Sequence, residues 1–150
     1  MTIVDRIYRE ATLPESSKGY VRDTITLGWE DRVQAHGRRR SDGGAEFGAS
    51  LQRGTVLRAG DCFLLDEARA VVVVVERAEP VFMIEPATPQ DWGLYAYHIG
   101  NRHQPIMITP RGIVCPDLPG VEQLLQQHHM PYVRSMSPFT PATVVVGHQH

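Results

Sequence analysis

Hydrophobic and polar positions in the first half of the chain repeat with the period of β-strands. Thr24–Leu27 alternates apolar and polar residues, and a second candidate strand runs through residues 47–51. Cys62–Leu65 and Ala70–Val75 flank a short polar turn, a pattern typical of a β-hairpin. The five consecutive valines at 71–75 predict a strand covered on both faces, because a half-exposed strand would alternate.

From about Glu79 the pattern changes to strands that alternate with helices. The predicted elements are a strand at Val81–Ile84, a helix that opens at Thr88, strands at residues 105–108 and 113–115, a helix that opens at Asp117, and a strand at Tyr132–Met136. This order, β-α-β-β-α-β, is the ferredoxin-like arrangement.

Both predicted helices carry recognisable signals. Thr88 is a favourable N-cap, Pro89 suits the first helical position and Asp91 is an acid at the third. In the second helix, apolar residues recur at the spacing of one helical face. They are Val121, Leu124 and Leu125, followed by His128.

The change of pattern predicts an α+β protein with two small domains and a tail. We expect an N-terminal all-β domain over residues 1–77, suited to protein contacts, and a ferredoxin-like domain over 78–139. Residues 140–150 form a short flexible C-terminal tail that contains histidines.

Charge and composition narrow the function. The 15 basic residues against 17 acidic ones leave a net charge of -2, which does not favour a nucleic-acid binder. The longest apolar run, residues 70–75, is far shorter than the about 20 residues that span a bilayer. The N-terminus lacks the features of a signal peptide, so we expect a cytoplasmic protein with no membrane contact.

The two cysteines, Cys62 and Cys115, have no paired spacing, which argues against a disulfide scaffold and a zinc knuckle. Each lies in a predicted strand, where a buried cysteine is usually a small inert hydrophobe. The run Arg38–Arg40 lies within residues 36–44, which are too polar to pack, and we expect a solvated loop there. No phosphate-binding loop and no acid–base pair of carboxylates stands out, so the sequence does not indicate an enzyme.

Histidines are the remaining candidates for chemistry. His148 and His150 are two residues apart, so in an extended tail both imidazoles project to one side and could bind one metal ion. The alternative is a frayed polar terminus.

Two further pairs of histidines lie at the ends of the predicted helices. His98 and His103 are five residues apart and cannot both face one ion if the helix continues. We interpret His98 as a partly buried structural residue and His103, at the helix end, as the better metal ligand. His128 and His129 end the second helix. A favourable interaction with the helix dipole is sufficient to explain histidines at this place, without a role in metal binding.

Three segments of the chain carry a recognisable pattern. The most specific is Tyr97-His98-Ile99-Gly100-Asn101-Arg102-His103. The second is the region from Arg38 to Asp61, with Ser41-Asp42-Gly43 and Arg53-Gly54, and the third is Pro138-Phe139-Thr140-Pro141, followed by the histidine-bearing tail. Together they resemble the UreE family of urease accessory proteins, the nickel metallochaperones. The first segment is close to the family's Tyr-His-Leu-Gly-Asn-Arg-His, and the second is similar to the family's β-domain.

The resemblance implies a homodimer built through the second domain, with His103 at the two-fold axis. Two copies of one weak ligand then become a pair, completed by the tail residues His148 and His150. It also implies that Ni(II) is delivered through the urease accessory GTPase for assembly of the urease active site, without catalysis by this chain. Imidazole ligands also suit Zn(II) and Cu(II), so these ions could bind the same site.

The chain departs from the family pattern in two places. Its tail has two histidines where many members have a long histidine-rich terminus, and it has Asp117-Leu118-Pro119 where some members carry further histidines. Both departures argue against storage of several ions. Two alternatives stay open: a general histidine-based metal buffer, and a peptide-binding adaptor in which metal is incidental.

Overall fold

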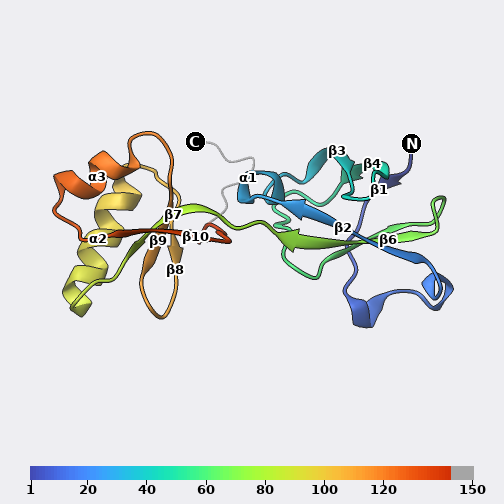
Figure 1. Cartoon of the computed structure of the whole chain (residues 1–150), viewed down its shortest axis with the longest axis horizontal. Helices are drawn as coiled ribbons and strands as arrows, with labels where there is room; N and C mark the ends of the chain where they lie inside the picture. The colour runs from blue at the N-terminus through green and yellow to red at the C-terminus, as the bar shows by residue number, and fades with distance from the viewer. Residues whose placement is uncertain (143–150) are drawn as a thin grey trace. The chain divides into compact units, whose positions relative to one another are not determined.

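The computed structural model describes residues 1–142, which divide into two compact units over residues 1–77 and 78–142 (Figure 1). The first unit is built mainly of strands and the second combines strands with two longer helices, so the predicted α+β class is confirmed. His148 and His150 lie outside the described residues.

The first unit contains two three-stranded sheets. Its strands are β1 (Ile3–Val4), β2 (Val21–Leu27), β3 (His36–Arg40), β4 (Glu46–Ser50), β5 (Cys62–Leu65) and β6 (Ala70–Glu76). One sheet has the order β1-β4-β3 and the other β2-β6-β5. Three short helices join them: η1 (Glu10–Thr12), η2 (Glu15–Ser17) and α1 (Trp29–Arg32).

The valine-rich strand β6 is the centre of its sheet, with β2 parallel on one side and β5 antiparallel on the other. The predicted hairpin of β5 and β6 is confirmed, with Leu65 opposite Ala70. Phe47 of the first sheet and Phe63 of the second are both fully buried, with ring centroids 4.9 Å apart. Contact between these rings places the core of the first unit between its two sheets.

The prediction of a loop over residues 36–44 was correct for residues 41–44, which form a turn, and wrong for residues 36–40. His36–Arg40 forms β3, which pairs antiparallel with β4 at the edge of its sheet. An edge strand can expose its side chains, so polarity alone does not exclude a strand. Arg39 is the exception, since its guanidinium donates to the carbonyls of Asp31 and Gln34 at 3.1 and 2.6 Å.

No pattern in the sequence predicts β1 or α1. β1 has two residues and pairs parallel with β4, and α1 has four residues. Neither is long enough to show a period. Arg32, the last residue of α1, is fully buried and donates to the carbonyls of Leu27 and Leu57 at 3.4 and 3.3 Å. These bonds compensate the burial of its charge.

The second unit is a four-stranded sheet packed against two helices. Its elements in chain order are β7 (Glu79–Ile84), α2 (Pro89–Asn101), β8 (Met107–Ile108), β9 (Ile113–Pro116), α3 (Val121–Gln127) and β10 (Val133–Ser137). The sheet order is β10-β7-β9-β8 and each neighbouring pair is antiparallel. The helices bury Ile99, Leu124 and Leu125 in one cluster with Phe82 and Ile113 of the sheet.

The predicted start of α2 is confirmed. Thr88 is the N-cap, its hydroxyl accepts a 3.0 Å bond from the Asp91 backbone N–H, and Pro89 occupies the first turn. Trp92 and Tyr95 pack against the core beside the fully buried Ile99, so these three residues form the inward face of the helix.

The predicted start of α3 at Asp117 was wrong by four residues. The helix begins at Val121, after Gly120, whose φ is 90°. The Asp117 backbone N–H instead donates to the Pro80 carbonyl at 3.0 Å, which extends pairing with β7. Two tight turns across Leu118 then redirect the chain. The predicted apolar face of the helix is nonetheless correct, because Val121, Leu124 and Leu125 are all buried.

After β10 the chain remains packed against the second unit. Phe139 is fully buried, and the Thr140 backbone N–H approaches the Met107 sulfur at 3.4 Å. The Ala142 backbone N–H donates to the Ile106 carbonyl at 2.6 Å. The last described residues are therefore held beside the segment that follows α2.

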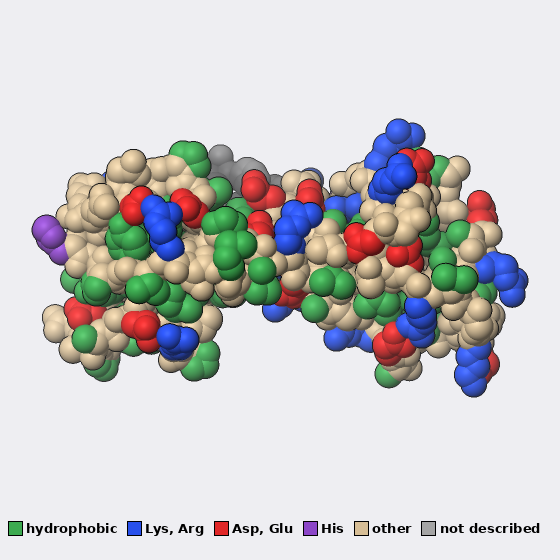
Figure 2. All heavy atoms as spheres, viewed as in Figure 1, with side chains coloured by type: hydrophobic (Ala, Val, Ile, Leu, Met, Phe, Trp, Pro, Cys, Tyr) green, Lys and Arg blue, Asp and Glu red, His purple; other side chains and the backbone are tan. Residues whose placement is uncertain are grey.

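Within residues 1–142, no helix has the length and apolar character needed to cross a membrane. On the face drawn in Figure 2, basic and acidic side chains are interspersed. No continuous basic surface appears on that face, in line with the nearly balanced charge of the chain.

Candidate metal centre

His103 lies in the turn that ends α2. Arg102 is the C-cap, the His103 N–H donates to the Gly100 carbonyl at 2.9 Å, and the Gln104 N–H donates to the Ile99 carbonyl at 3.3 Å. This pair of bonds is the Schellman motif, in which the residue after the C-cap adopts a left-handed conformation and is usually glycine. Here that residue is His103, with φ of 57°.

A histidine at this position has a conformational cost that glycine would avoid, because a Cβ disfavours positive φ. The side chain of His103 is exposed, so burial in the protein core does not offset that cost. Residues kept in such strained positions tend to cluster at functional sites. Arg69 and His129 share this backbone conformation, so the strain at His103 points to a functional residue only together with the segment in which it lies.

The end of α3 repeats the same arrangement. His128 is the C-cap and His129 has φ of 54°. The His129 N–H donates to the Gln126 carbonyl at 3.1 Å, and the Met130 N–H to the Leu125 carbonyl at 2.9 Å. Both longer helices thus end in a Schellman motif with a histidine at the left-handed position. The sequence does not predict these two helix ends, because glycine is the usual signal for a Schellman motif.

His98 and His103 differ in their surroundings: His98 lies within α2, and His103 lies just beyond its C-terminus. His98 is in the last helical turn, half-buried, and its ring stacks on that of His128 with centroids 3.9 Å apart and an interplanar angle of 15°. Tyr97 meets the His98 ring edge-on at 5.4 Å. The packing of His98 against two rings fits the predicted partly buried role.

The neighbourhood of His128 disfavours its charged form. Desolvation lowers the pKa of its imidazole, and nearby His98, Arg102 and His129 lower it further by charge repulsion. His128 is therefore neutral over a wider range of pH than an isolated histidine.

Neither cysteine is suited to bind a metal in this structure. Burial raises the pKa of the Cys115 thiol to about 12, and the pKa of Cys62 is also raised, first by desolvation. The thiolate is the form that binds metals, and burial suppresses it in both residues. Both are free and buried in their strands, as the sequence analysis expected.

Over residues 1–142, no group of three or more His, Cys, Asp or Glu side chains is arranged to hold a metal ion. His103 accordingly stands apart from other ligands within the described part of one chain. Its exposure leaves it accessible to ligands from outside that part.

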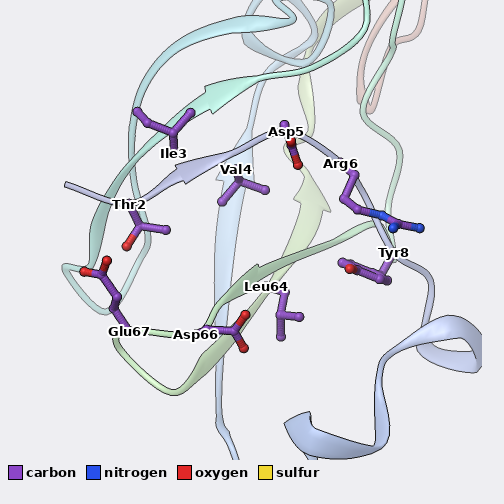
Figure 3. Close-up of a pocket in the computed structure, with 9 residues that line it drawn as sticks. All are labelled: Thr2, Ile3, Val4, Asp5, Arg6, Tyr8, Leu64, Asp66 and Glu67. Carbon is purple, nitrogen blue, oxygen red and sulfur yellow. The ribbon is translucent and has the colours of Figure 1, made fainter.

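A pocket of about 260 Å³ lies in the first unit, between the N-terminal segment and the β5–β6 hairpin (Figure 3). Asp5, Arg6, Asp66 and Glu67 are among its nine lining residues, which include no histidine and no cysteine. The pocket therefore contains none of the predicted metal ligands.

Comparison with known proteins gives two family matches that together cover most of the chain. The family described as UreE urease accessory protein, N-terminal domain, matches residues 4–76, and the corresponding C-terminal domain matches residues 79–150. These two matches meet at the division between the compact units of the structure.

Several proteins named urease accessory protein UreE are similar to the chain. The Staphylococcus aureus (strain MRSA252) protein is 32% identical over 140 residues, which cover 93% of each chain. The Streptococcus vestibularis protein is 33% identical over 110 residues, which cover 73% of each. The Rhodopseudomonas palustris (strain BisB18) protein is 31% identical over 119 residues, which cover 79% of this chain and 56% of that longer protein.

Matches to both domains, in the expected order, and identity above 30% across most of the chain agree with the resemblance carried by the Tyr97–His103 segment. The chain belongs to the UreE family of urease accessory proteins, a family of nickel metallochaperones and not of enzymes.

Proposed function

We propose that this protein is a cytoplasmic homodimeric chaperone that binds Ni(II) at the dimer interface. It delivers the ion through the urease accessory GTPase to the apo-urease assembly complex. The observation that carries the proposal is the placement of His103, exposed and left-handed, at the end of α2 within the family's most specific segment. Zn(II) or Cu(II) can bind to the same imidazole ligands.

In this proposal the two domains and the tail have different roles. Residues 1–77 contact partner proteins, and residues 78–139 form a ferredoxin-like domain for dimerisation and metal binding. The antiparallel sheet order β10-β7-β9-β8, with a helix after β7 and after β9, supports the ferredoxin-like assignment. Residues 140–150 supply the further ligands His148 and His150.

The exposed face of α2 supports dimerisation through the second domain. Leu94 and Tyr97 are large apolar residues with 49% and 63% of their surface exposed. Gly93 and Gly100 lie on the same helix, and a Cβ added to either would meet no neighbouring atom within 4 Å. An exposed apolar face with small residues allows another surface to pack closely, and here it ends next to His103.

The end of the described chain supports participation of the tail. The hydrogen bond from the Ala142 N–H to the Ile106 carbonyl holds the start of the tail beside Ile106. Ile106 is three positions after His103 in the sequence. An extended chain spans up to about 3.3–3.6 Å per residue, so six residues from Ala142 allow His148 a reach of roughly 20 Å. That reach is sufficient for a ligand of the His103 site.

Replacing His103 by alanine should abolish tight nickel binding, because each dimer loses two ligands at once. Calorimetric titration of Ni(II) into the dimer measures the effect. His129→Ala is the matched control, since it removes a histidine from the same left-handed position at the end of the other helix. Unchanged nickel affinity in His103→Ala would refute the proposed site.

Replacing His148 and His150 by alanine together should weaken nickel binding by about one to two decades without abolishing it. The two copies of His103 remain paired, and losses of this size are comparable to those caused by changes around metal ligands. The same titration, with absorbance recorded for the ligand field, tests this prediction. Unaltered affinity and spectrum would exclude the tail from the site.

A Leu94→Glu substitution should shift the equilibrium towards monomers, because it places a charge on the apolar face of α2. Sedimentation at a series of protein concentrations measures the change. Met136→Glu, at a residue 62% exposed on β10, is the control for a charge on an exposed apolar site of the same unit. An equal effect of both variants, or of neither, would argue against the α2 face as the interface.

Delivery is distinguished from simple buffering by the partner. The purified urease accessory GTPase should bind the wild-type dimer more tightly with Ni(II) than without it, and His103→Ala should remove the difference. Co-purification from mixtures of the two proteins is the measurement. Complete absence of binding under both conditions would favour a general metal buffer.

A further inference from the structure

The stacked imidazoles of His98 and His128 are the strongest feature that the proposed His103 site does not use. The two residues come from different helices, and their ring centroids are 3.9 Å apart. Among the described residues, neither ring forms a hydrogen bond with another side chain or with the backbone. Polar atoms of this kind usually have a hydrogen-bond partner in the protein or in solvent. Because the described part of the protein supplies none to these half-buried rings, their nitrogens are open to water or to a ligand.

The position of the pair favours a cation. His98 is in the last turn of α2 and His128 is the C-cap of α3, so both rings lie at helix C-termini, where the helix dipole is negative. Arg102 lies near enough to act on His128 and opposes this effect. Its side chain is exposed, so water screens its charge.

The chemistry of the pair selects the class of ion. Neutral imidazole nitrogens bind Zn(II), Ni(II) and Cu(II), whereas Mg(II) and Ca(II) prefer oxygen ligands. Two imidazoles that share one ion at about 2.0–2.1 Å have ligating nitrogens roughly 3 Å apart. Rings that already lie 3.9 Å apart reach that geometry by turning their planes away from each other.

We propose that His98 and His128 form a second binding site for one divalent transition-metal ion in each chain. With two protein ligands, the site keeps several coordination positions open to water and binds its ion weakly and reversibly. Both ligands come from described helices of one chain, so the site requires neither the dimer nor the tail. It stands independently of the function proposed above.

The test begins with the full-length variant His103→Ala, His148→Ala, His150→Ala, which lacks the ligands of the proposed primary site. Calorimetric titration with ZnCl₂ should show one weak ion per chain. Broadening by Cu(II) of backbone NMR signals should be centred on the ends of α2 and α3. If no ion binds this variant, or if the broadening lies elsewhere, the proposal is overturned.

Adding either His98→Gln or His128→Gln to that variant should weaken zinc binding by about tenfold or more. Removing a group that only hydrogen-bonds to a metal ligand lowers metal affinity by about 10–100-fold, and removing the ligand itself should lower it at least as much. His129→Gln is the matched control, because it removes the adjacent exposed histidine and should leave the affinity unchanged. Two separate substitutions guard against loss of folding in one of them, which circular dichroism detects. Zinc affinity unchanged in both folded glutamine variants, or lost only in the His129 control, would overturn the assignment.

Discussion

Burial of the apolar faces of α2 and α3 against the sheet fixes the chemistry of the second unit. Ile99 and Leu124 anchor the last turns of the two helices in one core with Phe82 and Ile113. Because both helices end close to these anchors, the backbone positions of His98, His103 and His128 are set by a core that contains no histidine. A metal ion is therefore not needed to place these three residues.

The ligands proposed for this protein are all imidazoles, and this choice determines how an ion would be held. Both thiols are buried and protonated, so they cannot supply the strong, slowly exchanging bonds that thiolates form. Imidazole bonds compete with protons near neutral pH and with other nitrogen ligands. Such binding suits a protein whose proposed task is to release its ion to a partner.

Local signals in the sequence were sufficient for much of the fold. The Thr88 cap and the apolar face of α3 were predicted correctly, because each depends on residues within one or two turns. The edge strand at His36–Arg40 and the delayed start of α3 were missed, since both depend on pairing with distant strands. His103 was proposed as a ligand from its place at the predicted helix end and from its family segment. Its left-handed backbone was missed because the usual glycine signal is absent, and the stacking of His98 on His128 arises only when the two helices pack.

The hydrogen bond between Ala142 and Ile106 also affects the local concentration of the tail histidines near His103. Six residues along the sequence separate this anchor from His148, and a tether of that length gives an effective local concentration in the millimolar range. In the proposed site, an imidazole at that concentration would return to the ion far more often than a free competitor at cellular dilution. Loss of this one backbone contact would then lengthen the tether and lower the local concentration, while leaving every proposed ligand in the chain.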